Sequence, residues 1–87
     1  MFWNKSKDKG EVKIRKSYYP SGALVLDIPF VSGEKHGTEK WYYESGAIYR
    51  ETPYENGRTH GIEKEYHESG ALKKETLYDD GKCMGEI

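Results

Sequence analysis

The chain of 87 residues has a single cysteine, Cys83, and no long run of apolar side chains. One thiol cannot form an intrachain disulfide, and it cannot build a cysteine-based zinc site. A lone cysteine is more typical of a reducing compartment than of secretion. The N-terminal segment 1–5 lacks the apolar stretch of a signal peptide, and the sequence has no transmembrane stretch. These absences predict a cytoplasmic protein.

Apolar residues are scarce as well, since they make up only 34% of the chain while charged residues make up 33%. Much of the apolar fraction is tyrosine, whose ring can be half-buried while its hydroxyl stays in water. No segment has a sustained apolar period of 3.6 residues, so we expect essentially no helix. A chain this short and polar cannot fill a thick core, but it can cover one face of a sheet.

Charge is distributed unevenly along the chain, although the formal net charge is only −1. Residues 1–40 carry eight basic and five acidic side chains, whereas residues 41–87 carry six basic and ten acidic ones. Blocks of this kind can steer a charged partner, and a solvated surface of mixed sign is the alternative. We expect residues 1–10 to be a flexible basic lead-in and residues 11–87 to form the folded domain.

Two signatures recur with the same period. A tyrosine-rich run, Ser-Gly and an aliphatic residue follow one another three times, so that Gly22, Gly46 and Gly70 are evenly spaced along the chain. A second signature has Gly33, Gly57 and Gly81 at the same spacing, each with a further glycine four residues on. A fixed period of this length indicates a repeat array.

Each repeat has the pattern of a β-hairpin. From Glu11 onward, apolar and polar residues alternate, which is typical of a strand. Ser-Gly between a tyrosine-rich and an aliphatic run predicts a tight turn. The chain is therefore predicted to be all-β, an elongated single-layer antiparallel sheet of three consecutive β-hairpin repeats, each about 24 residues long. We expect the strand pairs near 11–18 and 23–30, 38–43 and 47–54, and 61–67 and 71–78.

The register of the hairpins follows if Ser45 and Gly46 are the two central turn residues. Lysines then lie opposite acidic residues in all three hairpins, as Lys16–Asp27, Lys40–Glu51 and Lys64–Glu75. The same register sets Trp41 opposite Arg50, as a cation–π pair, and predicts the pairs Tyr19–Leu24, Tyr43–Ile48, His67–Leu72, Gly37–Tyr54 and Gly61–Tyr78. The face expected to be better buried carries Tyr19, Leu24, Leu26, Ile28, Phe30, Trp41, Tyr43, Ile48, Tyr54, Leu72 and Tyr78.

The repeated unit, Tyr-Tyr-x-Ser-Gly-x-Leu/Ile followed by Asn/Asp-Gly-Lys/Arg-x-His-Gly, resembles the MORN-repeat variant of bacterial proteins. The resemblance covers roughly residues 12–87 and is best in the middle unit, 39–61. It departs at Lys13, which stands where the first unit would have a leading glycine, and at Met84, which replaces a histidine. The last unit stops at Ile87, before we expect its next strand to form. The fold that the resemblance implies is a row of antiparallel hairpins.

The resemblance also implies a function. Proteins of this variant are often labelled as antitoxin components of toxin–antitoxin systems, the YwqK family. A protein of this kind would be an antitoxin, an immunity protein or a phage-encoded inhibitor that occludes a toxin, an effector or a nuclease complex. Other MORN proteins are described as scaffolds or as phospholipid-binding proteins.

Candidate catalytic and metal-binding residues do not assemble into a site. His36 and His60 occupy equivalent turn positions about one repeat apart, which is too far to share an ion, and His67 has no third ligand beside Glu63 or Glu65. The turn serines have no base nearby, and the recurring acidic residues have no unequal environments that would separate their pKa values. We therefore expect neither a metal nor a cofactor, and no enzymatic activity.

Protein binding remains the favoured prediction, because open sheet edges accept strands and Tyr and Trp are strong interface anchors. The alternatives are a scaffold module that self-associates, for example as a homodimer through its sheet edges, and a lipid- or nucleic-acid-binding surface. A pI near 6.3 and the few basic residues of the C-terminal half argue against nucleic acid and membranes. The candidate partner-binding residues are Tyr19, Trp41, Tyr43, Tyr54, Glu63, Glu65, Glu68 and Tyr78.

Overall fold

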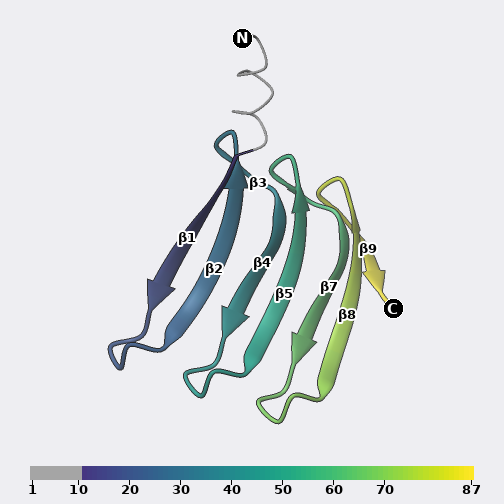
Figure 1. The fold of residues 1–87 in the computed structure, drawn as a ribbon. Helices are drawn as coiled ribbons and strands as arrows, with labels where there is room; N and C mark the ends of the chain where they lie inside the picture. Colours follow the sequence, from purple (N-terminus) through teal and green to yellow (C-terminus); the bar gives the residue numbers. More distant parts are fainter. Residues whose placement is uncertain (1–10) are drawn as a thin grey trace, which may run out of the picture.

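The structure is a computed structural model that describes residues 11–87, and these form a single antiparallel sheet (Figure 1). The predicted lead-in, residues 1–10, lies outside the described part. The strands run in the order β1-β2-β4-β5-β7-β8-β9, with β3 paired to β2 and β6 paired to β5. No helix occurs in residues 11–87, so the predicted fold class is confirmed. The strands are β1 (Val12–Tyr18), β2 (Leu24–Val31), β3 (Glu34–Lys35), β4 (Gly37–Tyr42), β5 (Ile48–Glu55), β6 (Arg58–Thr59), β7 (Gly61–Tyr66), β8 (Leu72–Asp79) and β9 (Lys82–Glu86).

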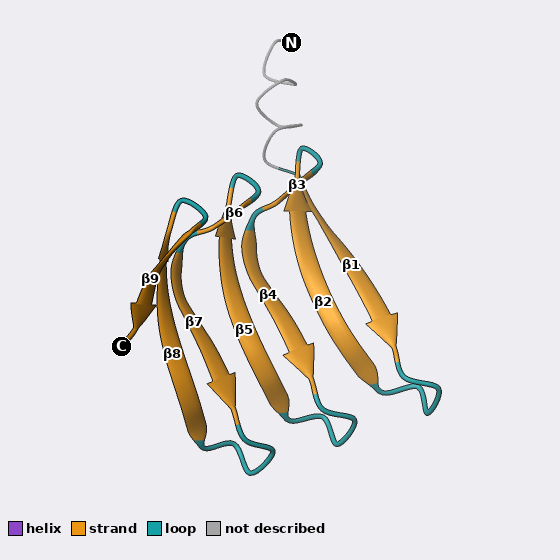
Figure 2. Ribbon diagram, turned by 180° about the vertical axis from the view of Figure 1, so that it is seen from behind, coloured by secondary structure: helices purple, strands orange, loops and turns teal. Residues whose placement is uncertain are grey.

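The sheet is one layer thick. Its principal extents are 50 × 36 × 15 Å, and the views from the two sides show no second layer over either face of the described residues (Figures 1 and 2). No apolar side chain in the described residues is buried, because a single layer leaves each face open to solvent. The buried residues are instead polar: Glu39, Thr52 and Thr76. The face predicted to be apolar and buried is thus only half-buried. Leu24, Ile48 and Leu72 were assigned to this face, but they pair with Tyr18, Tyr42 and Tyr66 and therefore lie on the opposite one, where Leu72 is 50% exposed.

At one end of the sheet, turns of two residues join β2 to β3, β5 to β6 and β8 to β9. At Asn56-Gly57 both φ angles are positive, at 50° and 85°, and Ser32-Gly33 and Asp80-Gly81 repeat this geometry. Two successive positive φ angles define the type I′ turn, whose twist matches that of the strands it joins. The second sequence signature therefore encodes these turns.

The Ser-Gly turns at the other end are longer than predicted. Tyr43 N–H donates to Ala47 O at 2.8 Å and Gly46 N–H donates to Tyr43 O at 2.9 Å, so three residues form the loop. Ile48 consequently pairs with Tyr42, and the predicted Tyr43–Ile48 pair is wrong. The same shift replaces the predicted Tyr19–Leu24 and His67–Leu72 pairs with Tyr18–Leu24 and Tyr66–Leu72.

A β-bulge then restores the predicted register. The pairing shifts between Trp41 and Tyr42, which leaves Tyr49 as the extra residue. Beyond the bulge, Lys40 pairs with Glu51 and Trp41 with Arg50, as predicted. The other pairs predicted away from the turns are also confirmed, namely Lys16–Asp27, Lys64–Glu75, Gly37–Tyr54 and Gly61–Tyr78.

The connections between hairpins contain strand structure that the sequence pattern did not indicate. The short strands β3 and β6 extend the ladders of β2 and β5 before the chain turns into the next hairpin. The last unit also forms a further strand, since β9 pairs with β8 from Lys82 to Glu86. The expectation that the chain stops before this strand is wrong, because the residues up to Glu86 already form four pairs with β8.

Candidate partner-binding face

Strand alternation brings most of the large aromatic side chains to one face of the sheet. Trp41 and Arg50 are a cross-strand pair, and Tyr54 lies on the same side of β5 four residues beyond Arg50. Tyr78 occupies the position of Tyr54 in the next hairpin, one repeat further along the chain. We call this surface the aromatic face and define it by Trp41, Tyr43, Tyr49, Arg50, Tyr54 and Tyr78.

Arg50 lies at the centre of the aromatic face. Its guanidinium carbon is 5.5 Å from the centroid of the Trp41 ring and 5.6 Å from that of Tyr49. The Tyr49 ring in turn meets Tyr43 edge-on, with 5.3 Å between centroids. The predicted Trp41–Arg50 cation–π contact is therefore present, and it extends to a second ring. Because the bulge adds Tyr49 beside Arg50, the cation is contacted by aromatic rings from two strands.

A buried carboxylate beside Trp41 is hydrogen-bonded to its indole ring. Glu39 is only 5% exposed, and it accepts hydrogen bonds from the Trp41 indole N–H and from the Lys35 ammonium. Lys35 Nζ also lies 4.7 Å from the centre of the Tyr54 ring. Burial lowers the pKa of Lys35, but the hydrogen bond and charge of Glu39 outweigh it, so the pKa is raised. A buried charge is tolerated when it is paired in this way.

A second carboxylate, Glu63, connects the middle hairpin to the last one. It accepts a hydrogen bond from the Thr52 hydroxyl at 2.8 Å, and Arg50 Nε lies 4.0 Å from the same oxygen. That Nε atom is buried and has no hydrogen-bond partner in the described residues. The charge of Glu63, followed by burial, raises the pKa of Tyr78. Tyr78 therefore presents a neutral phenol at neutral pH.

Most of the predicted partner-binding residues meet in this network. Trp41, Tyr43, Tyr54, Glu63 and Tyr78 belong to it, and Glu65 pairs with Arg50 across the β5–β7 ladder. Tyr19 corresponds to Tyr43 in the first hairpin, and its hydroxyl donates to Tyr42 O at 2.8 Å. Glu68 lies apart, exposed in a Ser-Gly turn.

Five residues of the network were absent from the candidate set predicted from the sequence: Lys35, Glu39, Tyr49, Arg50 and Thr52. Arg50 was identifiable, because the register already placed it opposite Trp41. The contact between Lys35 and Glu39 could not be predicted, because residues four apart in a continuous strand do not touch. The two side chains meet because the chain leaves β3 at His36 before β4 begins at Gly37.

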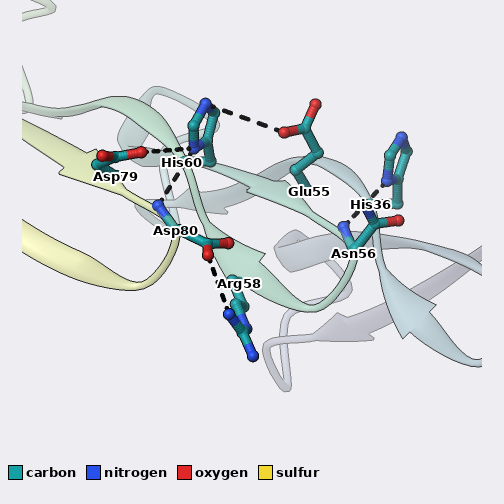
Figure 3. A network of polar contacts seen from close by, with 7 residues as sticks. All are labelled: His36, Glu55, Asn56, Arg58, His60, Asp79 and Asp80. Carbon is teal, nitrogen blue, oxygen red and sulfur yellow. Dashed lines mark hydrogen bonds and ion pairs between the residues drawn. The ribbon is translucent and has the colours of Figure 1, made fainter.

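The repeated histidines connect neighbouring hairpins (Figure 3). His36 Nδ1 accepts a hydrogen bond from the Asn56 amide and His60 Nδ1 accepts one from the Asp80 amide, both at 3.2 Å. His60 also lies 3.5 Å from the Asp79 carboxylate, and Arg58 pairs with Asp80 at 3.0 Å. Each histidine thus holds the backbone of the next type I′ turn. Within residues 11–87 no three His, Cys, Asp or Glu side chains are grouped so that they could hold a metal ion.

Comparison with known proteins identifies the repeat. Residues 35–56 and 59–80 match the family model described as MORN repeat variant, and together they make up just over half of the chain. The chain belongs to the MORN repeat variant family. Each matched segment contains one of the two histidines together with the turn amide that it binds. No curated protein and no solved structure gave a match.

MORN repeats indicate a repeat-based binding module. In this member, the sheet that the repeats build offers an aromatic face with one central arginine and a row of carboxylates beside it. The described part of the chain contains no helix that could cross a membrane.

Proposed function

We propose that this chain is a non-catalytic protein-binding module that acts in the cytoplasm as an antitoxin or immunity-type inhibitor. It binds a toxin, an effector or a nuclease and covers the working surface of that partner. The observation that supports this proposal is the aromatic face, a set of half-buried rings around one arginine that no second layer of the described residues covers.

The composition of the aromatic face suits protein recognition. Tyr, Trp and Arg are the residue types most enriched among energetically dominant interface positions. The network also holds these side chains in place: Glu39 orients Trp41, and Trp41 and Tyr49 flank Arg50. Side chains that are ordered before binding lose less conformational entropy when the partner arrives.

Charge favours a basic partner surface. Glu63 and Glu65 lie beside the aromatic face, and Glu68, Asp79 and Asp80 add exposed carboxylates in the last repeat. A nuclease or a nucleic-acid-directed toxin carries a basic substrate site, which such an acidic half would complement. Occluding that site would inhibit the partner without any chemistry on this chain.

Affinity capture from lysate of the native host, followed by mass spectrometry and light scattering, tests the proposal. We expect a stoichiometric complex with one protein, whose toxic or nucleolytic activity falls when the chain is added in equal amount. Tyr49→Ala, on the aromatic face, should weaken capture at least about tenfold. Ile62→Ala is the matched control, because Ile62 lies on the opposite face and is 41% exposed compared with 37% for Tyr49.

Two outcomes would overturn the proposal. One is recovery of the chain alone as a defined oligomer, which would identify a self-associating scaffold. The other is a captured partner whose activity the chain leaves unchanged.

A further inference from the structure

The first strand lacks a neighbour that its two counterparts have. β4 and β7 pair on both edges: on the outer side, β2 contributes Asp27 opposite Lys40, and β5 contributes Glu51 opposite Lys64. β1 pairs with β2 on one side, and within residues 11–87 no strand pairs with its other edge. All seven of its residues are exposed. An exposed edge of this kind is a template for strand addition.

The two internal junctions show which strand suits this edge. Lys16 is the counterpart of Lys40 and Lys64, since the three are separated from one another by one repeat. At both internal junctions, the last long strand of the preceding hairpin, β2 or β5, places a carboxylate opposite this lysine. The same pairing at β1 requires an acidic residue opposite Lys16, on a strand that runs antiparallel to β1.

The charge of β1 also selects against pairing with itself. The strand carries Lys13, Arg15 and Lys16 and no acidic residue. Two copies paired through this edge would bring these cations together, and like charges in opposite positions are destabilising. Beside the strand lies a hollow of about 500 Å³, and its wall includes two basic residues, Lys13 and Arg15, one acidic residue, Glu11, and Phe30. Both features favour a carboxylate-rich occupant.

We propose that the β1 edge binds an extended acidic segment of the partner protein, which adds to the sheet as an antiparallel strand and places a carboxylate opposite Lys16. This inference rests on the proposed function, because it specifies where and by which chemistry the partner is held. Backbone hydrogen bonds to β1 would supply affinity, and Lys13, Arg15 and Lys16 would supply the preference for acidic sequences.

A peptide taken from the chain itself provides the probe. Residues 47–55 include the strand that presents Glu51 to Lys64, so a synthetic peptide of this sequence carries the required carboxylate. Titrated into the ¹⁵N-labelled full chain, it should shift the amide resonances of β1 around Lys16 and Ser17. The Glu51→Lys peptide should bind at least about fivefold more weakly, because an attractive cross-strand pair becomes repulsive.

Reciprocal charge reversal completes the test. Lys16→Glu should invert the preference, so that the Glu51→Lys peptide becomes the tighter ligand. Lys73→Glu is the matched control: Lys73 is exposed and has no ion pair or hydrogen-bond partner within residues 11–87, so its reversal should leave both affinities unchanged. Resonance shifts outside β1 would overturn the inference. So would peptide affinities that do not depend on the charge at residue 16 of the chain or at residue 51 of the peptide.

The inference about the β1 edge and the proposed protein-binding function can be tested independently. If Lys16→Glu captures the natural partner as well as the wild type does while Tyr49→Ala does not, the β1 inference is wrong and protein binding stands. If light scattering shows a mass that rises with concentration and Lys16→Glu abolishes the rise, the occupant is a second copy, and the proposed acidic partner segment is wrong.

Discussion

At the first junction between hairpins β2 lies against β4, and at the second β5 lies against β7. Both junctions have the same backbone design. Each has two cross-strand residue pairs, a tyrosine hydroxyl that donates to a carbonyl of the next hairpin, and a histidine that accepts from a backbone amide of the next turn. In each, a turn glycine also donates to the preceding connection, Gly57 to Lys35 O and Gly81 to Thr59 O.

The side chains that fill the two junctions differ. Leu26 lies opposite Trp41 at the first junction, whereas Arg50 lies opposite Glu65 at the second. The second junction adds polar contacts from Thr52 to Glu63, from Tyr66 to Glu51 and from Arg58 to Asp80. The repeat therefore fixes the backbone contacts, and the positions between them vary without altering the sheet. It follows that the two junctions should respond alike to changes in the backbone and differently to changes in side chains.

The largest effects are expected at the glycines that begin β4 and β7. Gly37 and Gly61 have φ of 114° and 116°, and a Cβ would lie 3.0 Å from Pro29 Cγ and 3.2 Å from Pro53 Cγ. Gly37→Ala and Gly61→Ala should each lower the free energy of unfolding by about 2 kcal/mol or more, through backbone strain and crowding. Urea denaturation measures this. Gly22→Ala is the control, because φ is +95° but no heavy atom lies within 4 Å, and it should cost only about 1 kcal/mol. An equal loss in all three variants would contradict the prediction.

Equivalent positions in the two junctions should differ in how much they stabilise. Trp41 and Glu65 are one repeat apart and occupy the same place in β4 and β7. Trp41→Ala should cost about 2 kcal/mol, because a half-buried ring and its contacts are lost. Glu65→Ala should cost less than about 1 kcal/mol, because Glu65 lies opposite Arg50 but its carboxylate makes no ion pair or hydrogen bond within residues 11–87. Thermal and urea unfolding of the two variants under identical conditions makes the comparison, and similar losses would show that the junctions are not distinguished by their side chains.

The tyrosine hydroxyls should matter equally at both junctions. Tyr19 and Tyr43 donate to Tyr42 O and Tyr66 O at 2.8 and 2.9 Å. Tyr19→Phe and Tyr43→Phe should each reduce stability by about 1 kcal/mol, the net value of one hydrogen bond. Tyr18→Phe, at an exposed tyrosine of β1, should change stability by less than about 0.5 kcal/mol. A clear difference between Tyr19→Phe and Tyr43→Phe would mean that the backbone contacts of the junctions are not equivalent.

Salt should affect the two junctions unequally. Raising NaCl to about 1 M shortens the screening length to about 3 Å, which weakens partly exposed ion pairs such as Arg58–Asp80 and Arg50–Glu63. Site-resolved amide exchange should show opening free energies in β7 and β8 falling by several tenths of a kcal/mol, and those in β2 and β4 changing less. A uniform change along the sheet would indicate that electrostatic contacts do not distinguish the junctions.

The smallest effect is expected at alkaline pH. Burial and the hydrogen bond to Glu51 raise the pKa of Tyr66, and the charge of Glu63 and burial raise that of Tyr78. A pKa that is higher in the folded state contributes stability below the unfolded pKa of tyrosine, about 10, and this contribution is lost as pH rises through the folded value. Stability should therefore decline above about pH 10, and Tyr66→Phe should reduce the decline. An unchanged pH profile in this variant would contradict the role of Tyr66.

Much of the fold could be predicted from the sequence because the same turn and pairing signals occur in all three repeats. The regular period, the Asn-Gly and Asp-Gly turns and the lysine–acid pairs each correspond to local geometry, and all are present in the structure. The length of the turns at Ser21-Gly22, Ser45-Gly46 and Ser69-Gly70 could not be predicted in the same way. Ser-Gly fits a two-residue turn and also a three-residue loop followed by a bulge, and both give the same pairing at Lys40–Glu51.

The candidate site was only partly predictable. Alternation shows which side chains share a face, so Trp41, Tyr54 and Tyr78 could be grouped from the sequence. It does not show which positions a single layer covers, and the buried residues proved to be Glu39, Thr52 and Thr76. The role of His36 was also hidden, because its bond to the Asn56 amide joins residues that come together only when neighbouring hairpins align.

Amide hydrogen exchange on the free chain and on its complex with the captured partner most directly tests the central claim, an open sheet that binds a protein through its aromatic face and β1 edge. In the free chain, β4 and β5 should exchange most slowly and β1 and β9 fastest, because β1 and β9 are the two edge strands of the described sheet. In the complex, protection should rise along β1 and in the strands beneath the aromatic face. Uniform protection of the free chain, or a complex that leaves β1, β4 and β5 unchanged, would contradict the claim.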